Sequence, residues 1–191
     1  MTGTRTYPDE ASGPFPSPPT RFEDKDGRPI EIVGLETFDG EAFEDVVEMY
    51  GKFSPEDRAQ GIPPTGEDRI RDWLEAIGNA SINVVARHDG DVIGHAVLVP
   101  ETDDPSSIDD RGDLEWELAI FVLQAYQRAG IGTQLLEGLL GHAVEQGVER
   151  VWLTVERWNN PAIALYERVG FEATGTESFE QEMAIRLGEE A

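Results

Sequence analysis

The sequence predicts a mixed α/β fold in which a sheet of six to seven strands is covered by about four helices. Two observations predict it. In the middle of the chain, Asp89-Gly90 lies between two β-rich runs, and this arrangement is a strong hairpin signal. From residue 114 onward, strand-like and helix-like segments alternate, which is typical of parallel strands joined by helices. A chain with both features forms a sheet with antiparallel and parallel parts.

Apolar periodicity defines the elements of the first half of the chain. Val46, Val47 and Tyr50 recur at helical spacing, and Ser54 followed by Pro55 has the cap and first-position residues of a further short helix. The other elements expected here are a strand over 30–35, helices over 42–50 and 67–77, and the hairpin strands 82–88 and 92–99.

The second half of the chain begins with a polar loop over 101–113. Apolar runs then alternate with amphipathic segments, as at Leu135, Leu136 and Leu139. The elements expected here are a strand over 114–123, a helix over 130–146, a strand over 150–156, a helix over 160–169 and a last strand over 180–187.

The first 29 residues have a different composition from the rest. They contain six of the twelve prolines, are densely charged and show no periodicity. Such a composition favours a flexible, solvated arm, although a binding role stays open. The sequence therefore predicts an arm over 1–29 and a single domain over 30–191.

The chain is strongly acidic: 39 acidic against 15 Lys and Arg residues give a formal charge of −24. Nucleic acid and anionic membranes would be repelled, so neither is an expected partner. The basic residues are arginines apart from Lys25 and Lys52. This composition resembles that of proteins from salt-loving microbes, in which molar salt screens charges beyond about 3 Å. An acidic surface that attracts a basic partner is the alternative.

Several classes of site are excluded or unsupported. The chain contains no cysteine, which excludes disulfides and thiolate nucleophiles. His88, His95 and His142 lack ligand spacing, so no metal is expected. No apolar run approaches the ~18 residues of a membrane span, and the N-terminus does not read as a signal peptide. A cytoplasmic protein, as a monomer or homodimer, is expected.

The most informative segment is Gln127-Arg128-Ala129-Gly130-Ile131-Gly132-Thr133, between an expected strand and an expected helix. Glycines there let the backbone approach a ligand, and the first N–H groups of the helix together with its dipole favour a pyrophosphate. The segment lacks the third glycine of the Rossmann pattern and the lysine of the Walker pattern. Taken alone, it is equally compatible with a tight turn.

A second segment adds context. Residues 159–171 read Asn-Asn-Pro-Ala-Ile-Ala-Leu-Tyr-Glu-Arg-Val-Gly-Phe. Together the two segments resemble the Gln/Arg-x-x-Gly-x-Gly motif and the downstream Asn-x-x-Ala-Ile-x-Leu-Tyr-x-x-x-Gly-Phe segment of the GCN5-related N-acetyltransferase (GNAT) superfamily. The resemblance covers about residues 30–187. It implies a sheet splayed between 114–123 and 150–156, with the pantetheine of acetyl-CoA between those strands.

The resemblance also implies the residues that bind acetyl-CoA. Backbone groups would hold the pantetheine arm, the glycine-containing segment would hold the pyrophosphate, and the motif asparagine would contact the cofactor. These residues are Phe121, Val122 and Leu123, then Gln127, Arg128, Ala129, Gly130, Ile131, Gly132 and Thr133, and finally Asn159. Asn160 is expected as the N-cap of the following helix, with Pro161 at its first position.

Transfer of an acetyl group to an amine needs a base and a proton donor for the leaving thiolate. Glu117 is the candidate base, because family members related to protein lysine acetyltransferases carry Glu in this strand. Glu115 points the same way on a strand and is the second carboxylate, and a water relay with Glu115 is the alternative to Glu117 as the base. Tyr166 is the matching acid. The competing interpretations are solvated carboxylates at a strand end and, for Tyr166, a core aromatic.

The acceptor is expected to be a primary amine, with protein lysine favoured. Residues 53–58 resemble a stretch of the Pat-type protein lysine acetyltransferases, and Thr154 replaces the Glu that ribosomal-protein N-terminal acetyltransferases carry. Direct transfer in a ternary complex is expected. A small-molecule amine acetyltransferase and a non-catalytic acyl-CoA sensor remain the alternatives.

Overall fold

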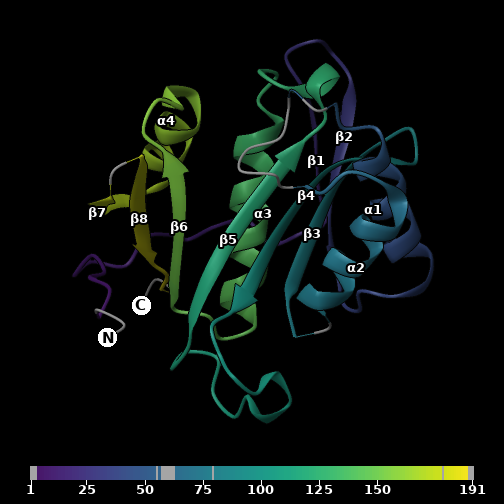
Figure 1. Cartoon of the computed structure of the whole chain (residues 1–191). Coiled ribbons are helices and arrows are strands. Elements are labelled where there is room, and N and C mark those ends of the chain that lie inside the picture. Colours follow the sequence, from purple (N-terminus) through teal and green to yellow (C-terminus); the bar gives the residue numbers. More distant parts are fainter. Residues whose placement is uncertain (1–3, 55, 57–62, 79, 178, 189–191) are drawn as a thin grey trace.

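The structure is a computed structural model that describes residues 4–54, 56, 63–78, 80–177 and 179–188. It contains an eight-stranded mixed sheet in the order β1-β2-β3-β4-β5-β6-β8-β7 (Figure 1). The strands are β1 Thr20–Glu23, β2 Pro29–Leu35, β3 Ile82–His88, β4 Asp91–Pro100, β5 Glu115–Val122, β6 Arg150–Glu156, β7 Glu172–Glu177 and β8 Glu180–Arg186. The β5–β6 pair is parallel, and the other neighbouring pairs are antiparallel.

Helices cover both faces of this sheet, as the sequence predicted. They are α1 Gly40–Gly51, α2 Glu67–Ile77, α3 Ile131–Glu145 and α4 Asn160–Val169. Alternation along β5 divides the core: Trp116 and Leu118 pack into the cluster that contains α3 and α4, whereas Phe121 packs against the cluster of α1 and α2. The same alternation leaves Glu115 and Glu117 on the second face.

Most expected elements are confirmed to within two residues, because their apolar periodicity matches the face that they bury. Two strands at the edges of the sheet, β1 and β7, were not predicted. The strand β7 carries mainly exposed polar side chains and contains Gly175 at a register shift. The strand β1 has four residues, of which only Phe22 is apolar, so neither strand has a strand-like apolar pattern. The expected short helix after Ser54 and the segment 53–58 include residues 55, 57 and 58, which lie outside the described residues.

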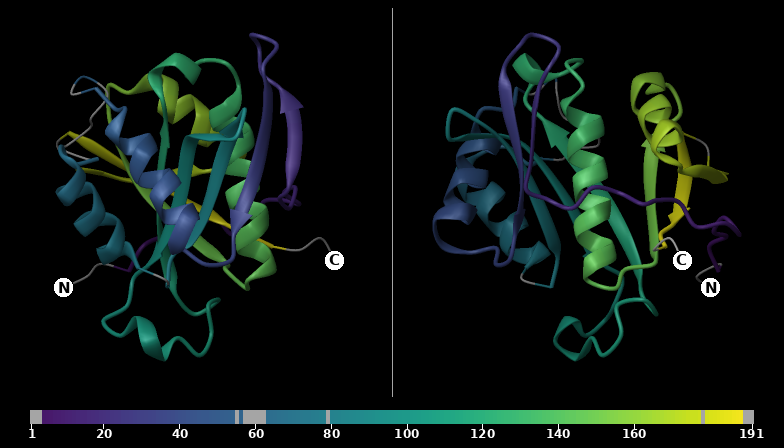
Figure 2. Two further views of the ribbon diagram at one scale, coloured as in Figure 1. Left: turned by 90° about the vertical axis from the view of Figure 1, so that its right-hand side faces the viewer. Right: turned by 180° about the vertical axis from the view of Figure 1, so that it is seen from behind.

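The described part of the predicted arm, residues 4–29, packs on the domain. Phe15 contacts the main core, and the chain crosses α3 so closely that a Cβ at Gly141 would collide with the Pro16 carbonyl (Figure 2). The Ser12 N–H then donates to the Arg186 carbonyl of β8 at 2.8 Å. The sequence pattern missed these contacts, because they depend on single residues and not on a periodic face.

The sheet opens between β5 and β6. Only three residue pairs join these strands, and the last of them is Glu117 with Trp152. Beyond that pair the strands diverge toward α4, as Figure 1 shows. The splayed sheet that the sequence resemblance implied is therefore present. Among the described residues, no helix is long and apolar enough to cross a bilayer.

Candidate functional site

On β5, the backbone groups that face the opening toward β6 are those that do not bond to β4. The Leu123 N–H donates to the Ile93 carbonyl of β4 at 3.0 Å. Because antiparallel strands direct alternate residues to alternate sides, the backbone groups of Phe121 and Leu123 face β4. Those of Ile120 and Val122 face the opening.

The opposite edge of the opening belongs to β6. The Leu187 N–H donates to the Glu149 carbonyl at 2.8 Å, which sets the alternation on β6 and turns the backbone groups of Thr154 and Glu156 toward β5. Of the expected stretch 121–123, then, only Val122 presents its backbone to the opening. Ile120 was missed, because register cannot be read from the sequence.

The glycine-containing segment links the end of β5 to α3. Arg128 and Gly130 have positive φ angles of 59° and 90°, and the Gln127 Nε2 donates to the Val122 carbonyl at 2.9 Å. A Cβ at Gly130 would meet no atom within 4 Å, whereas one at Gly132 would contact Leu165 of α4 at 3.6 Å. The two glycines therefore differ. Gly130 adopts a left-handed backbone conformation that favours glycine, whereas Gly132 is an ordinary helical position.

The N-terminus of α3 is the electropositive end of the site. The first turn of α3 contains no acidic residue, and its first N–H groups point out of the helix. The Arg168 Nη1 on α4 donates to the Thr133 Oγ1 at 3.4 Å, so a guanidinium lies beside this turn. Ile131 and Ala129 are buried and anchor the segment to the core. Although the net charge of the protein is −24, these N–H groups and the Arg168 guanidinium allow the N-terminus of α3 to bind an anion.

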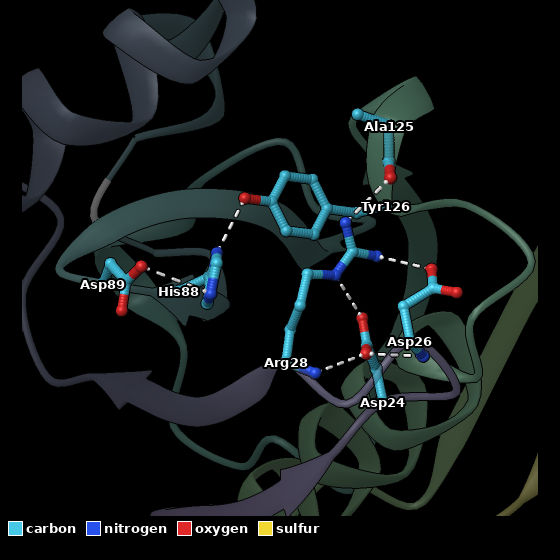
Figure 3. A network of polar contacts seen from close by, with 7 residues as sticks. All are labelled: Asp24, Asp26, Arg28, His88, Asp89, Ala125 and Tyr126. Atoms are coloured by element: carbon cyan, nitrogen blue, oxygen red, sulfur yellow. Dashed lines mark hydrogen bonds and ion pairs between the residues drawn. The ribbon is translucent and has the colours of Figure 1, made fainter.

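A turn between β1 and β2 braces the same segment (Figure 3). Arg28 stacks over the Tyr126 ring at 4.2 Å, and its Nη1 donates to the Ala125 carbonyl at 3.1 Å. Arg28 is held by Asp24, whose Oδ2 accepts from its Nε at 2.7 Å. Burial alone would raise the pKa of Asp24, but hydrogen bonds and the charge of Arg28 lower it overall. The Lys25 N–H also donates to the Ala129 carbonyl at 3.0 Å.

The Asn159 side chain caps α4. Its Oδ1 accepts from the Ala162 N–H at 3.3 Å, so Asn159 is the N-cap, Asn160 the first helical residue and Pro161 the second. The expectation that Asn160 is the cap was wrong by one residue. Capping uses one acceptor of Asn159 and leaves its amide N–H groups for other contacts.

Glu117 lies where the opening begins. Its side chain lines a pocket of about 430 Å³ together with Trp152 and Glu101. Burial raises the pKa of Glu117, the nearby Arg5 lowers it, and Glu101 raises it; the net direction is upward. Glu115, on the same face, instead forms an ion pair with Arg5 at 3.1 Å. The two carboxylates therefore differ: Glu117 is the one whose environment favours accepting a proton.

Tyr166 is almost fully buried on α4 and packs edge-on against Phe171, with ring centroids 5.7 Å apart. Burial raises its pKa to about 12, so the hydroxyl keeps its proton at neutral pH. The structure thus shows Tyr166 as a core aromatic residue, and its role as a proton donor stays a prediction.

The histidines occupy other environments. His95 is fully buried between Tyr50 and Asn83, with hydrogen-bond distances of 2.6 and 2.8 Å, and burial lowers its pKa to about 3. His88 Nδ1 lies 2.8 Å from the Tyr126 hydroxyl (Figure 3). Within the described ranges, no group of three or more His, Asp or Glu side chains is arranged to hold a metal ion.

Solved structures share this fold. The GNAT domain of Streptomyces lividans PAT superposes with a TM-score of 0.71 over 88% of this chain and 96% of that one, at 18% identity. The Salmonella typhimurium protein yncA, whose structure contains its cofactor acetyl-CoA, superposes with a TM-score of 0.62 at 21% identity, over 85% and 96% of the two chains. At such identities the likeness shows the fold.

Two curated relatives match at the level of sequence. An uncharacterized N-acetyltransferase of Mycobacterium tuberculosis is 34% identical over 98 residues, which cover 50% of this chain and 56% of the relative. A spermine/spermidine N(1)-acetyltransferase of Bacillus subtilis is 33% identical over 101 residues, or 51% and 64%. The match thus spans less than two thirds of either relative. The sequence model of the acetyltransferase (GNAT) family, however, matches residues 43–171, about two thirds of the chain, and the chain belongs to this family.

Proposed function

We propose that the protein is an acetyl-CoA-dependent N-acetyltransferase that moves an acetyl group to a primary amine in a ternary complex. The observation that carries the proposal is the opening between β5 and β6, with Glu117 at its closed end and the α3 N-terminus at its open end. A strand rises about 3.3 Å per residue, so roughly 20 Å separate Glu117 from Leu123. An extended ligand with an anionic end fits this arrangement.

The residues present fit acetyl-CoA. Ile120 and Val122 offer backbone groups to the pantetheine arm, and the segment from Gln127 to Thr133 offers N–H groups to the pyrophosphate. The space over Gly130 is open, so a phosphate can approach the backbone there. When bound, acetyl-CoA supplies the activated acetyl thioester. Family membership and the acetyl-CoA in the Salmonella structure support this assignment.

The chain's own residues supply the proton transfers. Transfer breaks the thioester C–S bond and forms an amide C–N bond. Glu117 takes the proton that the amine loses, a role for which its raised pKa suits it, and Tyr166 donates a proton to the departing sulfur and regains one from water. The sequence contains no cysteine to carry the acetyl group, which supports direct transfer.

The acceptor side is acidic and suits a cationic amine. Protein lysine is the acceptor that the sequence favours, and the likeness to a spermine/spermidine N(1)-acetyltransferase supports polyamines as the second candidate. Composition supports a cytoplasmic enzyme adapted to high salt. Both acceptor classes need the amine deprotonated at the closed end of the opening, beside Glu117.

The deciding experiment is acetyl-CoA turnover, measured by release of free thiol, with lysine peptides, polyamines and monoamines in low and molar KCl. We expect turnover in the wild type and its loss in Glu117→Gln, whereas Glu172→Gln, an exposed control on β7, keeps full activity. CoA binding without turnover of any amine would identify an acyl-CoA sensor and refute the enzyme. Equal rates at both salt levels would refute the adaptation to salt.

A further inference from the structure

Arg5 contacts a group of acidic side chains on the face of the sheet that also carries Glu117. Its Nη1 contacts Glu101 at 2.6 Å and Glu115 at 3.1 Å, and its Nε contacts Glu182 at 3.3 Å. The guanidinium carbon lies 3.5 Å from the centroid of the Trp152 ring, which is a cation–π contact. Three carboxylates, from β5, β8 and the residue after β4, and one aromatic face thus surround a single cation, which lies 96 or more residues away from them in sequence.

This cation site adjoins the predicted catalytic base. Trp152 pairs with Glu117 in the β5–β6 register, and Glu101, Trp152 and Glu117 line the same pocket. Arg5 is near enough to Glu117 to influence its pKa. A molecule that delivers an amine to Glu117 therefore passes beside the position that the Arg5 guanidinium occupies.

Carboxylates outnumber cations around this site. Five carboxylates and two guanidinium groups line the surrounding hollow of about 650 Å³. Glu182 is fixed by the Thr174 hydroxyl, which donates to its Oε1 at 3.1 Å. The Arg5 side chain is 18% exposed and those of Glu101, Glu115 and Glu182 are 43%, 26% and 28% exposed, so solvent reaches the ion pairs and screens them in part. The occupant can therefore be displaced while the acidic walls stay in place.

The arm carries Arg5 as a tethered group. The Arg186 Nε donates to the Pro8 carbonyl at 2.8 Å, and Ser12 bonds to the same strand. Anchoring at Pro8 leaves a short segment that presents Arg5 to the site at high effective concentration, on the order of millimolar.

We propose that Glu101, Glu115, Glu182 and Trp152 form the subsite for a second cationic group of the acceptor, and that Arg5 occupies it as an internal competitor. The inference rests on the proposed function, since it concerns the acceptor of the same site. It specifies the substrate class: a molecule with two cations, one delivered to Glu117 as the amine and the other exchanged for Arg5 on the Trp152 face.

The test compares 1,4-diaminobutane with butylamine, which have the same chain length and carry two cations and one. Binding is measured by calorimetry in the presence of CoA, without turnover, and KM is measured separately. In Arg5→Ala we expect the Kd and KM for the diamine to fall about fivefold or more. The values for butylamine and the Kd for acetyl-CoA stay within twofold of the wild type.

Matched variants separate competition from charge and folding. Arg21→Ala removes the same charge from an exposed ion pair on β1 and should change neither affinity, and Arg5→Lys should behave like the wild type. Combining Arg5→Ala with Glu182→Gln should cancel the gain. Arg5→Gln, which removes the charge but keeps a polar side chain, gives the same answer if the alanine variant does not fold.

An unchanged or weaker affinity for the diamine in both Arg5→Ala and Arg5→Gln would show that Arg5 is a structural residue, and the proposal would be wrong. An equal gain for butylamine would also overturn it, because the subsite would then not recognise a second cation. If the diamine binds more tightly but no amine is acetylated, the subsite stands and the proposed enzyme fails. The two proposals are therefore separable.

Discussion

Substituting the two glycines of the segment before α3 should have opposite effects. Gly130 has φ of 90°, where an alanine side chain is strained by about 1–2 kcal/mol, partly offset by about 0.4–1 kcal/mol from the less flexible unfolded chain. Gly130→Ala should therefore lower the free energy of unfolding by roughly 1 kcal/mol. Gly132 has ordinary helical geometry and space for a Cβ at 3.6 Å from Leu165. Gly132→Ala should be neutral or stabilising by up to about 1 kcal/mol.

The same pair separates binding from stability. The Cβ at Gly130 projects into the open space that the proposal assigns to the pyrophosphate. Gly130→Ala should raise the Kd for CoA at least about tenfold, a loss of roughly 1.4 kcal/mol, while Gly132→Ala stays near the wild-type value. A loss of about 1 kcal/mol in stability leaves a typical domain folded, so it cannot by itself weaken binding tenfold.

Urea unfolding of the free protein and calorimetry with CoA measure the two effects. Gly138→Ala on the same helix is the control for packing, because its Cβ would lie 2.8 Å from Ile32 Cγ2, far from the anion site. It should lose stability and keep its affinity for CoA. Equal CoA affinities in Gly130→Ala and Gly132→Ala would refute the assignment of the phosphates to this segment.

Three further predictions concern the chemistry and the brace. Glu117→Gln should lower kcat about a hundredfold or more. The wild-type rate should fall as pH drops through the raised pKa of Glu117. The pH–rate profile of Glu117→Gln should lack this fall, whereas that of Glu115→Gln should keep it. Tyr166→Phe should lower kcat about tenfold with CoA affinity kept, and a large loss of CoA affinity would instead mark Tyr166 as purely structural. Arg28→Ala should raise the Kd for CoA severalfold by releasing Tyr126 and the Ala125 carbonyl, and an unchanged Kd by calorimetry would show that the brace is dispensable.

The elements around the site follow from the sequence because their signals are local. The helix at 67–77 and the strand at 150–156 match the structure at both ends, since each has a continuous periodic face and clear boundaries. The side-by-side placement of Glu115 and Glu117 follows from strand alternation alone. Their different environments do not, because they depend on Arg5 and Glu101, which reach them only in the folded chain.

The contacts that sequence reasoning missed join segments far apart in the chain. Arg28 reaches Ala125, Arg168 reaches Thr133 and Arg5 reaches Glu182, and none of these pairs leaves a periodic or motif signal. Ile120 was missed for a related reason, since the side to which a backbone group points depends on register with β4. The motif thus predicts where the site lies, whereas the surrounding ion pairs form between segments that only the fold brings together.

The divided sheet also makes the β5–β6 ladder the shortest in the sheet, with three residue pairs. Few backbone hydrogen bonds therefore oppose local opening between β5 and β6. The N–H groups of Ile120, Val122 and Thr154, which this ladder leaves unpaired, should exchange hydrogen early in the free protein. A ligand bound between β5 and β6 binds only the closed form and should slow exchange on both edges at once. The proposed binding site then coincides with the part of the sheet that has the fewest backbone hydrogen bonds to break.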